Sequence, residues 1–199
     1  MPSFAHRGAA PAVAPGAWVA PTATLVGAVT VAAGARICHG AVLNAEDGTI
    51  AVGATTIVLE NAVLRAAREH PLELGPHCVV GPHAYLSGCS LADRVFVATG
   101  ARVFNGASLG SGSEVRIGAV VHLRTRLGPG AVVPIGWVAV GDPAQILAPG
   151  EHDAIWAAQE PLDFPGYVFG VDRNGPDPMG ELTERWSRSL GRHADDDLR

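Results

Sequence analysis

The sequence is poor in aromatic and charged residues. Aromatic side chains make up 6% of its 199 residues and charged ones 17%, whereas 48% are hydrophobic. So many hydrophobic residues with so little charge exclude an intrinsically disordered chain. The shortage of aromatic residues also excludes a core built from large rings. Glycine (25 residues) and proline (15 residues) are abundant instead, which favours many tight turns between short elements.

Long apolar runs and basic clusters are missing as well. No apolar run reaches the roughly 18–20 residues that span a bilayer, so we expect no membrane partner. The net charge is −5 and no basic stripe with interleaved aromatic residues occurs, which makes nucleic acid an unexpected partner. Residues 1–10 contain Arg7 but no apolar segment, so we expect no secretory signal there.

Cysteine is scarce. Cys38, Cys78 and Cys89 are odd in number and form no CxxC pair. This usage is typical of free, reduced thiols, and we expect a cytoplasmic protein.

Aliphatic residues recur every six positions in four runs, which together make twenty hexads. Small residues, mostly alanine, stand four positions after many of these aliphatics, and Gly, Pro or Asn crowd the positions between. The hexad residues are Val13, Val19, Leu25, Val31, Ile37 and Leu43; Val52, Val58 and Leu64; Leu74, Val80 and Leu86; and Leu91, Val97, Val103, Leu109, Val115, Val121, Leu127 and Val133.

A period of six does not match an amphipathic helix, whose period is 3.6 residues. It fits short strands that meet at tight corners, stacked so that each coil covers the apolar edge of the next. We therefore predict an all-β solenoid, a left-handed parallel β-helix of hexapeptide repeats, over residues 1–148. Three hexads per coil give six to seven coils. Residues 149–199 should form a C-terminal α-helix and an extended tail that packs on the solenoid.

The repeat is interrupted at three places. Residues 44–51 insert three extra residues, residues 65–73 insert four, and the hexad at Leu86 is one residue short. The two insertions predict loops.

Beyond residue 148 the pattern changes. Residues 151–160 predict a helix that Pro161 and Pro165 should end. Residues 172–180 have a linker composition, residues 181–191 predict a second helix, and residues 193–199 should fray. The aromatic residues between and within these segments favour packing across the solenoid; they are Phe164, Tyr167, Phe169 and Trp186.

Five segments carry a resemblance to known proteins: residues 16–23, 59–64, 74–91, 133–136 and 140–144, which include the short hexad before Leu91. They resemble the γ-class carbonic anhydrases and their carnitine-operon and phenylacetate-operon relatives. The resemblance extends over residues 15–144, about two thirds of the chain.

The resemblance implies a homotrimer with zinc between subunits, bound by three histidines and an open water position. Zinc lowers the pKa of that water, so that hydroxide attacks carbon dioxide. In this sequence the three histidine positions hold Arg65, Pro82 and Ser87. We therefore expect a member without zinc ligands, without a cofactor and without zinc carbonic anhydrase activity.

Other family positions also differ. The family's arginine and aspartate near the first insertion are Asn44 and Glu46 here, and its glutamine is Leu59. The acid of that segment remains as Glu60, and Asn105 matches a residue common in the family.

The repeat places these side chains. A residue that follows an inward aliphatic points outward, so Asn44, Arg65, Ser87 and Phe104 should stack on one face, and His39, Glu60, Pro82 and Thr99 at the preceding corner. In a trimer like the family's, face and corner of neighbouring subunits would form a cleft. The candidate substrate-binding residues are Asn44, Glu46, Arg65, Ser87, Phe104 and Asn105, and the candidate catalytic residues are Glu60, Arg65 and His83.

Two roles remain open for Arg65. Its guanidinium can clamp the carboxylate of a small anionic metabolite, or it can form an intersubunit ion pair with Glu60. His83 can act as a general base with Glu60, contribute with His70 to a rearranged metal site, or be a surface residue. Two further functions stay open for the whole chain: a hexapeptide acyltransferase that uses acetyl-coenzyme A, and a non-catalytic structural or assembly trimer.

Overall fold

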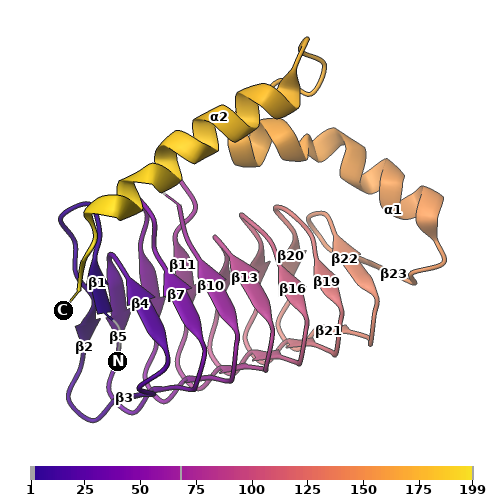
Figure 1. Ribbon diagram of the computed structural model, residues 1–199. Coiled ribbons are helices and arrows are strands. Elements are labelled where there is room, and N and C mark those ends of the chain that lie inside the picture. The colour runs from indigo at the N-terminus through magenta and orange to yellow at the C-terminus, as the bar shows by residue number, and fades with distance from the viewer. Residues whose placement is uncertain (1–2, 68, 199) are drawn as a thin grey trace.

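A computed structural model describes residues 3–67 and 69–198. Its strands form three parallel sheets that wrap around one axis (Figure 1). Sheet 1 contains β1 (Ser3–Ala5), β4 (Thr24–Val26), β7 (Val42–Asn44), β10 (Val63–Arg65), β13 (Tyr85–Ser87), β16 (Arg102–Val103), β19 (Val120–Val121) and β22 (Val138–Val140), with antiparallel β23 (Gln145–Leu147) and β24 (Asp197–Leu198) at its edges.

The other two sheets have seven strands each. Sheet 2 contains β2 (Ala12–Val13), β5 (Val29–Val31), β8 (Ile50–Val52), β11 (Leu72–Leu74), β14 (Ser90–Leu91), β17 (Ser108–Leu109) and β20 (Arg126–Leu127). Sheet 3 contains β3 (Trp18–Val19), β6 (Arg36–Ile37), β9 (Ile57–Val58), β12 (Val79–Val80), β15 (Phe96–Val97), β18 (Glu114–Val115) and β21 (Val132–Val133).

Strands β1 to β22 take the three sheets in strict rotation, so the described chain completes seven turns and starts an eighth. The predicted left-handed parallel β-helix is thus confirmed. The count of six to seven coils was too low, because the first turn begins at β1, ahead of the first hexad residue Val13.

The hexad aliphatics form the core. Leu43, Leu64 and Leu86 are fully buried and lie directly above one another in β7, β10 and β13. Burying one such side chain contributes about 1.5–3 kcal/mol. Because side chains alternate between the two faces of a strand, this ladder fixes which neighbours point outward.

The interruptions are loops, as predicted. Residues 45–49 connect β7 to β8, and residues 66–71 connect β10 to β11, although Arg68 lies outside the described residues. The short hexad is a two-residue turn between β13 and β14. At all three places the chain leaves the end of a sheet 1 strand, directly after Asn44, Arg65 or Ser87.

The C-terminal segment differs from the prediction in detail. Helix α1 (His152–Gln159) is followed by the 3₁₀-helix η1 (Glu160–Leu162), the π-helix η2 (Pro165–Phe169) and helix α2 (Pro178–Leu190). Helix α1 ends at Gln159, before Pro161, as predicted. The chain nevertheless stays helical, because Pro161 and Pro165 each occupy the first or second position of a new helical turn, where a missing N–H costs nothing. Helix α2 starts three residues early because the Asp177 carboxylate caps it by accepting from the Gly180 N–H.

The chain end is ordered rather than frayed. After η3 (Gly191–Asp195), strand β24 pairs antiparallel with β1, with Leu198 opposite Phe4. This pairing covers the edge of the first strand, which would otherwise present unpaired backbone groups. Figure 1 shows α2 running back along the solenoid to β1, which brings the two chain ends together. Arg199 lies outside the described residues.

Tyr167 of η2 docks the C-terminal segment on the solenoid. Its ring lies 4.9 Å from the His70 ring, and the Arg124 guanidinium lies 5.5 Å from its centroid. Its hydroxyl rests on Gly106, where a Cβ would come within 2.4 Å of the Tyr167 oxygen. The predicted packing of the aromatic tail therefore takes place at a site where only glycine fits.

We predict that Gly106→Ala destabilises the fold more than Gly100→Ala. Both glycines have left-handed backbone angles, with φ of +76° and +65°, so each substitution should lower the free energy of unfolding by about 1–2 kcal/mol. A Cβ at Gly100 meets open space, whereas one at Gly106 should displace Tyr167 and cost roughly 1 kcal/mol more. Urea unfolding of the two variants measures the difference, and equal losses would contradict the docking role of Tyr167.

Candidate functional site

Sheet 1 carries a column of outward side chains. Arg65 pairs in register with Asn44 on one side and Ser87 on the other. Leu86 pairs with Val103, so Phe104 follows at the next level of the column. The structure therefore brings these four residues together in the order in which the repeat stacks them.

A cavity of about 400 Å³ lies between this column and the C-terminal segment. Glu46, Arg65, Ser87, Phe104 and Asn105 line it, together with Asp47, Ala66, Ala67 and Tyr85 from the solenoid, Phe164, Val168 and Phe169 from η2 and the residue before it, and Leu182, Arg185, Trp186 and Ser189 from α2. Within one chain, the wall opposite Arg65 is thus supplied by η2 and α2.

The roof of the cavity is aromatic. The Phe169 ring lies 5.6 Å from the Phe164 ring and 5.2 Å from the Trp186 ring. On the floor, Tyr85 and Phe104 have ring centroids 6.0 Å apart. Apolar side chains on both sides lower the local dielectric and strengthen the electrostatic interactions of charged groups at the edge of the cavity.

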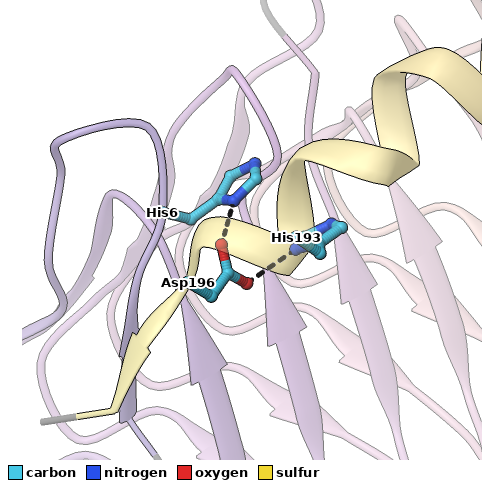
Figure 2. A group of neighbouring side chains, drawn as sticks. All are labelled: His6, His193 and Asp196. Carbon is cyan, nitrogen blue, oxygen red and sulfur yellow. Dashed lines mark hydrogen bonds and ion pairs between the residues drawn. The ribbon is translucent and has the colours of Figure 1, made fainter.

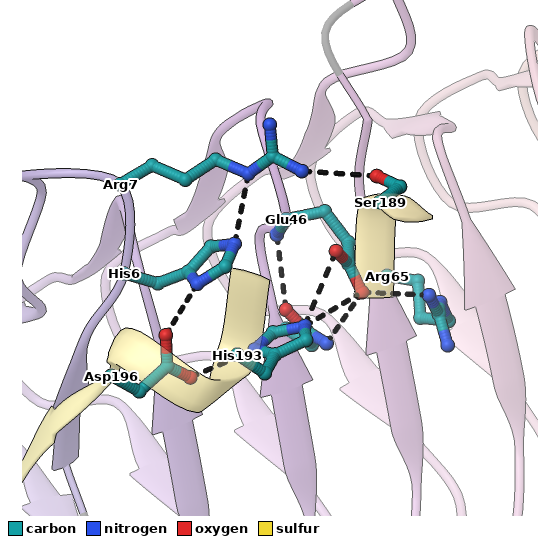
Figure 3. A network of polar contacts seen from close by, with 8 residues as sticks. His6, Arg7, Glu46, Arg65, Ser189, His193 and Asp196 are labelled. Carbon is teal, nitrogen blue, oxygen red and sulfur yellow. Dashed lines mark hydrogen bonds and ion pairs between the residues drawn. The ribbon is translucent and has the colours of Figure 1, made fainter. Parts of the chain in front are cut away.

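Glu46 is the central charged residue of the site (Figure 3). It stands in the loop after β7 with φ of +49°, and its N–H donates to Asn44 Oδ1 at 3.0 Å. Its Oε1 accepts from Asn44 Nδ2 and from an Arg65 Nη2, both at 2.9 Å. The Glu46 side chain is only 9% exposed, so the Arg65 pair is shielded from water on one side.

Three residues from the chain ends, His6, His193 and Asp196, lie together beside the site (Figure 2), and His193 is the one that contacts Glu46. His193 Nε2 lies 3.4 Å from the Glu46 carboxylate, and His193 Nδ1 lies 2.7 Å from Asp196 Oδ2. Asp196 Oδ1 lies 2.5 Å from Nδ1 of His6, a fully buried side chain. The two histidine rings stack with centroids 4.2 Å apart.

The pKa values follow from these contacts. Burial alone would lower the pKa of His193, but the hydrogen bonds and charges of Asp196 and Glu46 outweigh it and raise that pKa. Burial would likewise raise the pKa of Asp196, yet the hydrogen bonds from His193 and His6 bring it below the ordinary aspartate value.

The predicted catalytic residues are not all in this cavity. Glu60 and His83 lie exposed at the corner between sheets 3 and 1, and the contact between them joins the His83 N–H to the Glu60 carbonyl at 3.0 Å. Within this chain Arg65 pairs with Glu46, and the Glu60 carboxylate instead lies beside Cys38. Burial, followed by the charge and hydrogen bond of Glu60, raises the pKa of the Cys38 thiol. All three cysteines are free thiols.

Sequence reasoning missed the contribution of the chain ends. His6, His193 and Asp196 share no motif and are separated by almost the whole chain, so no spacing could connect them. The aromatic residues of the tail gave the one usable signal, because they predicted packing on the solenoid.

The solenoid part of the sequence is similar to known proteins. Gamma carbonic anhydrase 1 of Arabidopsis thaliana, a mitochondrial protein, is 33% identical over 144 residues, which cover 69% of this chain and 50% of the relative. The carnitine operon protein CaiE of Escherichia coli is 30% identical over 115 residues, covering 58% and 59%. The solenoid of this chain is γ-carbonic anhydrase-like. The chain spans about half the length of the curated relatives it matches first. No family model matches the sequence.

Solved structures agree on the fold. A putative acetyltransferase of Bacillus cereus superposes with a TM-score of 0.63 at 18% identity, covering 93% of this chain and 95% of that one. A hexapeptide transferase family protein of Anaplasma phagocytophilum gives a TM-score of 0.51 at 23% identity, covering 93% and 94%.

In the γ-carbonic anhydrase-like chain described here, no helix in residues 3–67 and 69–198 is long and apolar enough to cross a membrane.

We predict that Glu46→Gln lowers the pKa of His193. The substitution removes the negative charge that helps to hold the proton on this imidazole. Histidine titration by NMR measures the change, and Glu114→Gln, an acid on the distant sheet 3, is the matched control. If the His193 midpoint were the same in both variants, Glu46 would not be an electrostatic partner of His193.

Proposed function

We propose that this γ-carbonic anhydrase-like chain binds or converts a small anionic metabolite at the Arg65 cavity and does not hydrate carbon dioxide at zinc. The observation that carries the proposal is the position of Arg65: its guanidinium lies at the edge of a cavity of about 400 Å³ with an aromatic roof. A guanidinium fork matches the geometry of a carboxylate and can bind both of its oxygens.

The side chains around Arg65 suit an anion. A guanidinium has five N–H donors, and the contact with Glu46 uses one of them. The Ser87 hydroxyl and the Asn105 amide line the same cavity and offer further donors. Arg185, the other cation of the lining, is already engaged by Glu181 at 2.7 Å and by the carbonyls of Phe169 and Gly170, so Arg65 is the better anchor.

We further propose that the family's three zinc positions are Arg65, Pro82 and Ser87 in this chain. A guanidinium is a permanent cation and the proline side chain has no donor atom, so at most the Ser87 hydroxyl remains. These residues do not fit a zinc ion, which needs three protein ligands from histidine, cysteine or carboxylate in a catalytic site.

A homotrimer would complete the proposed site. The outer face of sheet 3 carries exposed apolar side chains, with Trp18 and Phe96 both 43% and Val132 36% exposed, beside Arg36 and Glu114. Self-association would bury these apolar side chains. The same association would bring the Glu60–His83 corner of one subunit toward the Arg65 face of the next. There His83 would serve as a general base and Glu60 would orient it.

Loss of the guanidinium should weaken anion binding. We expect Arg65→Ala to weaken binding of small carboxylates by roughly tenfold or more, since a charge-assisted contact contributes about 1.5–3 kcal/mol. Arg126→Ala, which removes an exposed arginine from sheet 2, should leave binding unchanged. Calorimetry with acetate, bicarbonate and larger carboxylic acids measures the affinities.

Each outcome of this screen assigns the chain to one function. Carboxylate binding that is insensitive to Arg65→Ala refutes the Arg65 anchor. A response to acetyl-coenzyme A alone would assign the chain to the acyltransferases instead. A response to no compound would favour a structural or assembly role.

Carbon dioxide hydration should not exceed the buffer rate. Stopped-flow assays with a pH indicator, with and without added Zn²⁺, measure it, and zinc-dependent hydration would refute the assignment of Arg65, Pro82 and Ser87. A zinc-containing γ-carbonic anhydrase assayed in parallel is the positive control.

A further inference from the structure

The residues that join the chain ends to the site form a continuous polar chain. From the solenoid it runs from Arg65 through Glu46 to His193, and from there through Asp196 to His6 (Figure 3). We call His6, His193 and Asp196 the terminal clasp. It fastens the end of the segment that roofs the cavity to the first strand of the solenoid.

The terminal clasp has the composition of a metal site, and its ligand-capable atoms lie within 4.8 Å of one another. Its geometry favours hydrogen bonds instead. The two imidazole planes are stacked and only 18° apart, so an ion in the plane of one ring lies well outside the plane of the other. In addition, Arg7 Nε donates to His6 Nε2 at 2.9 Å, which places the ring proton of His6 on Nδ1, facing Asp196.

Asp196 therefore accepts two N–H bonds, one from each histidine. His6 makes its bond as a neutral imidazole, because Arg7 occupies its other nitrogen as a donor. His193 faces a carboxylate at each ring nitrogen, and only the imidazolium can donate to both. Only a protonated His193 can therefore donate to Asp196 and to Glu46 at the same time.

The charge of His193 also acts on the cavity. When it is protonated, it shares the Glu46 carboxylate with Arg65, so the group around Glu46 carries one more positive charge than when His193 is neutral. When it is neutral, Glu46 is balanced by Arg65 alone, and the field that attracts an external anion is weaker.

We propose that His193 is a positioning residue that makes anion binding at Arg65 depend on pH: in its protonated form it holds the C-terminal segment over the cavity through its contact with Glu46 of the solenoid and leaves Arg65 available to a carboxylate. This inference deepens the proposed function and rests on it for the anion. The closure of the segment does not depend on any ligand.

The groups that face His193 come from four segments. Asp196 belongs to its own segment, Glu46 to the loop after β7, and His6 to the end of β1. Arg7 acts through His6, where it also donates to Ser189 Oγ of α2 at 3.0 Å, and Arg65 acts through Glu46. The charged residues nearest to His193 in the sequence, apart from Asp196, are Arg192 and Asp195. The two facing carboxylates outweigh the cations, in agreement with the raised pKa of His193.

The sign of the pH dependence follows. A histidine whose pKa is raised on folding stabilises the folded form below its ordinary value near 6.5, and this contribution disappears as the pH rises through the raised value. Asp196, whose pKa is lowered from 3.8, contributes above that value and fails only in stronger acid. The clasp should therefore be closed at pH 5–6 and open as the solution becomes alkaline.

Hydrogen exchange tests the closure without any ligand. Protection factors of residues 190–198, corrected for intrinsic exchange, should fall roughly threefold or more between pH 6 and pH 9 in the unmodified protein. In His193→Gln, whose amide can donate but cannot titrate, they should stay constant over that range. His152→Gln, on α1, is the matched control and should keep the dependence. Equal pH dependence in His193→Gln would overturn the proposal.

Carboxylate affinity over the same range tests the coupling. The affinity should fall roughly three- to tenfold on alkalinisation in the unmodified protein, and the fall should vanish in His193→Gln. If exchange changes as expected but no carboxylate binds at any pH, the proposed function fails while the clasp stands. If carboxylates bind through Arg65 without a His193-dependent pH effect, the proposed function stands and the coupling fails.

Metal titration separates the two interpretations of the clasp. Calorimetry with Zn²⁺ and Ni²⁺ measures metal binding in the unmodified protein, in His193→Gln and in Asp196→Asn. We expect no stoichiometric binding at the clasp, so neither substitution should remove any. One equivalent bound tightly and lost in both variants would make the cluster a metal centre and overturn the hydrogen-bonded clasp.

Discussion

The ladder of inward aliphatic side chains is the constraint on which the other features depend. Leu43, Leu64 and Leu86 lie one above another, and because side chains alternate along a strand, the next residue of each coil must face outward at the same height. The site is therefore a column of aligned side chains rather than a loop constellation. A one-residue slip of a single coil would turn its outward residue into the core, so the apolar packing that stabilises the solenoid also maintains the order of Asn44, Arg65 and Ser87.

A single carboxylate then connects this column to the C-terminal segment. Glu46 stands where the chain leaves sheet 1, and it accepts from Asn44 and Arg65 on the solenoid side while it faces His193 on the other. The half-buried guanidinium is held in place by one shielded counter-charge, and its own charge is not fully screened by water. The cost is that Glu46 and any external carboxylate attract the same cation, which is why a second cation close to Glu46 matters.

Local sequence was sufficient for features that repeat. The period of six predicted the solenoid, the loops at residues 44–51 and 65–73, and the stacking of Arg65 with its neighbours. It missed β1, whose segment Ser3–Ala5 has no hexad aliphatic of the series. It also predicted a frayed end, because the polar residues after His193 have no apolar pattern. These residues are ordered by pairing with β1 and by contacts with His6. Both are contacts between the two ends of the chain, which no local pattern can predict.

The return of the chain also limits what the cavity can do chemically. Helix α2 places Leu182 and Trp186 over the column in the same chain, so the roof of the site belongs to the C-terminal segment and its floor to the solenoid. Under the proposed function, a guanidinium replaces a Lewis acid: it can bind and orient an anion, but it cannot lower the pKa of a water molecule by coordination. A conversion at this site would then need a proton acceptor from elsewhere. Within reach of the Glu46 carboxylate, His193 is the titratable group that could couple such a proton to closure, and a neighbouring subunit could add His83 from its corner.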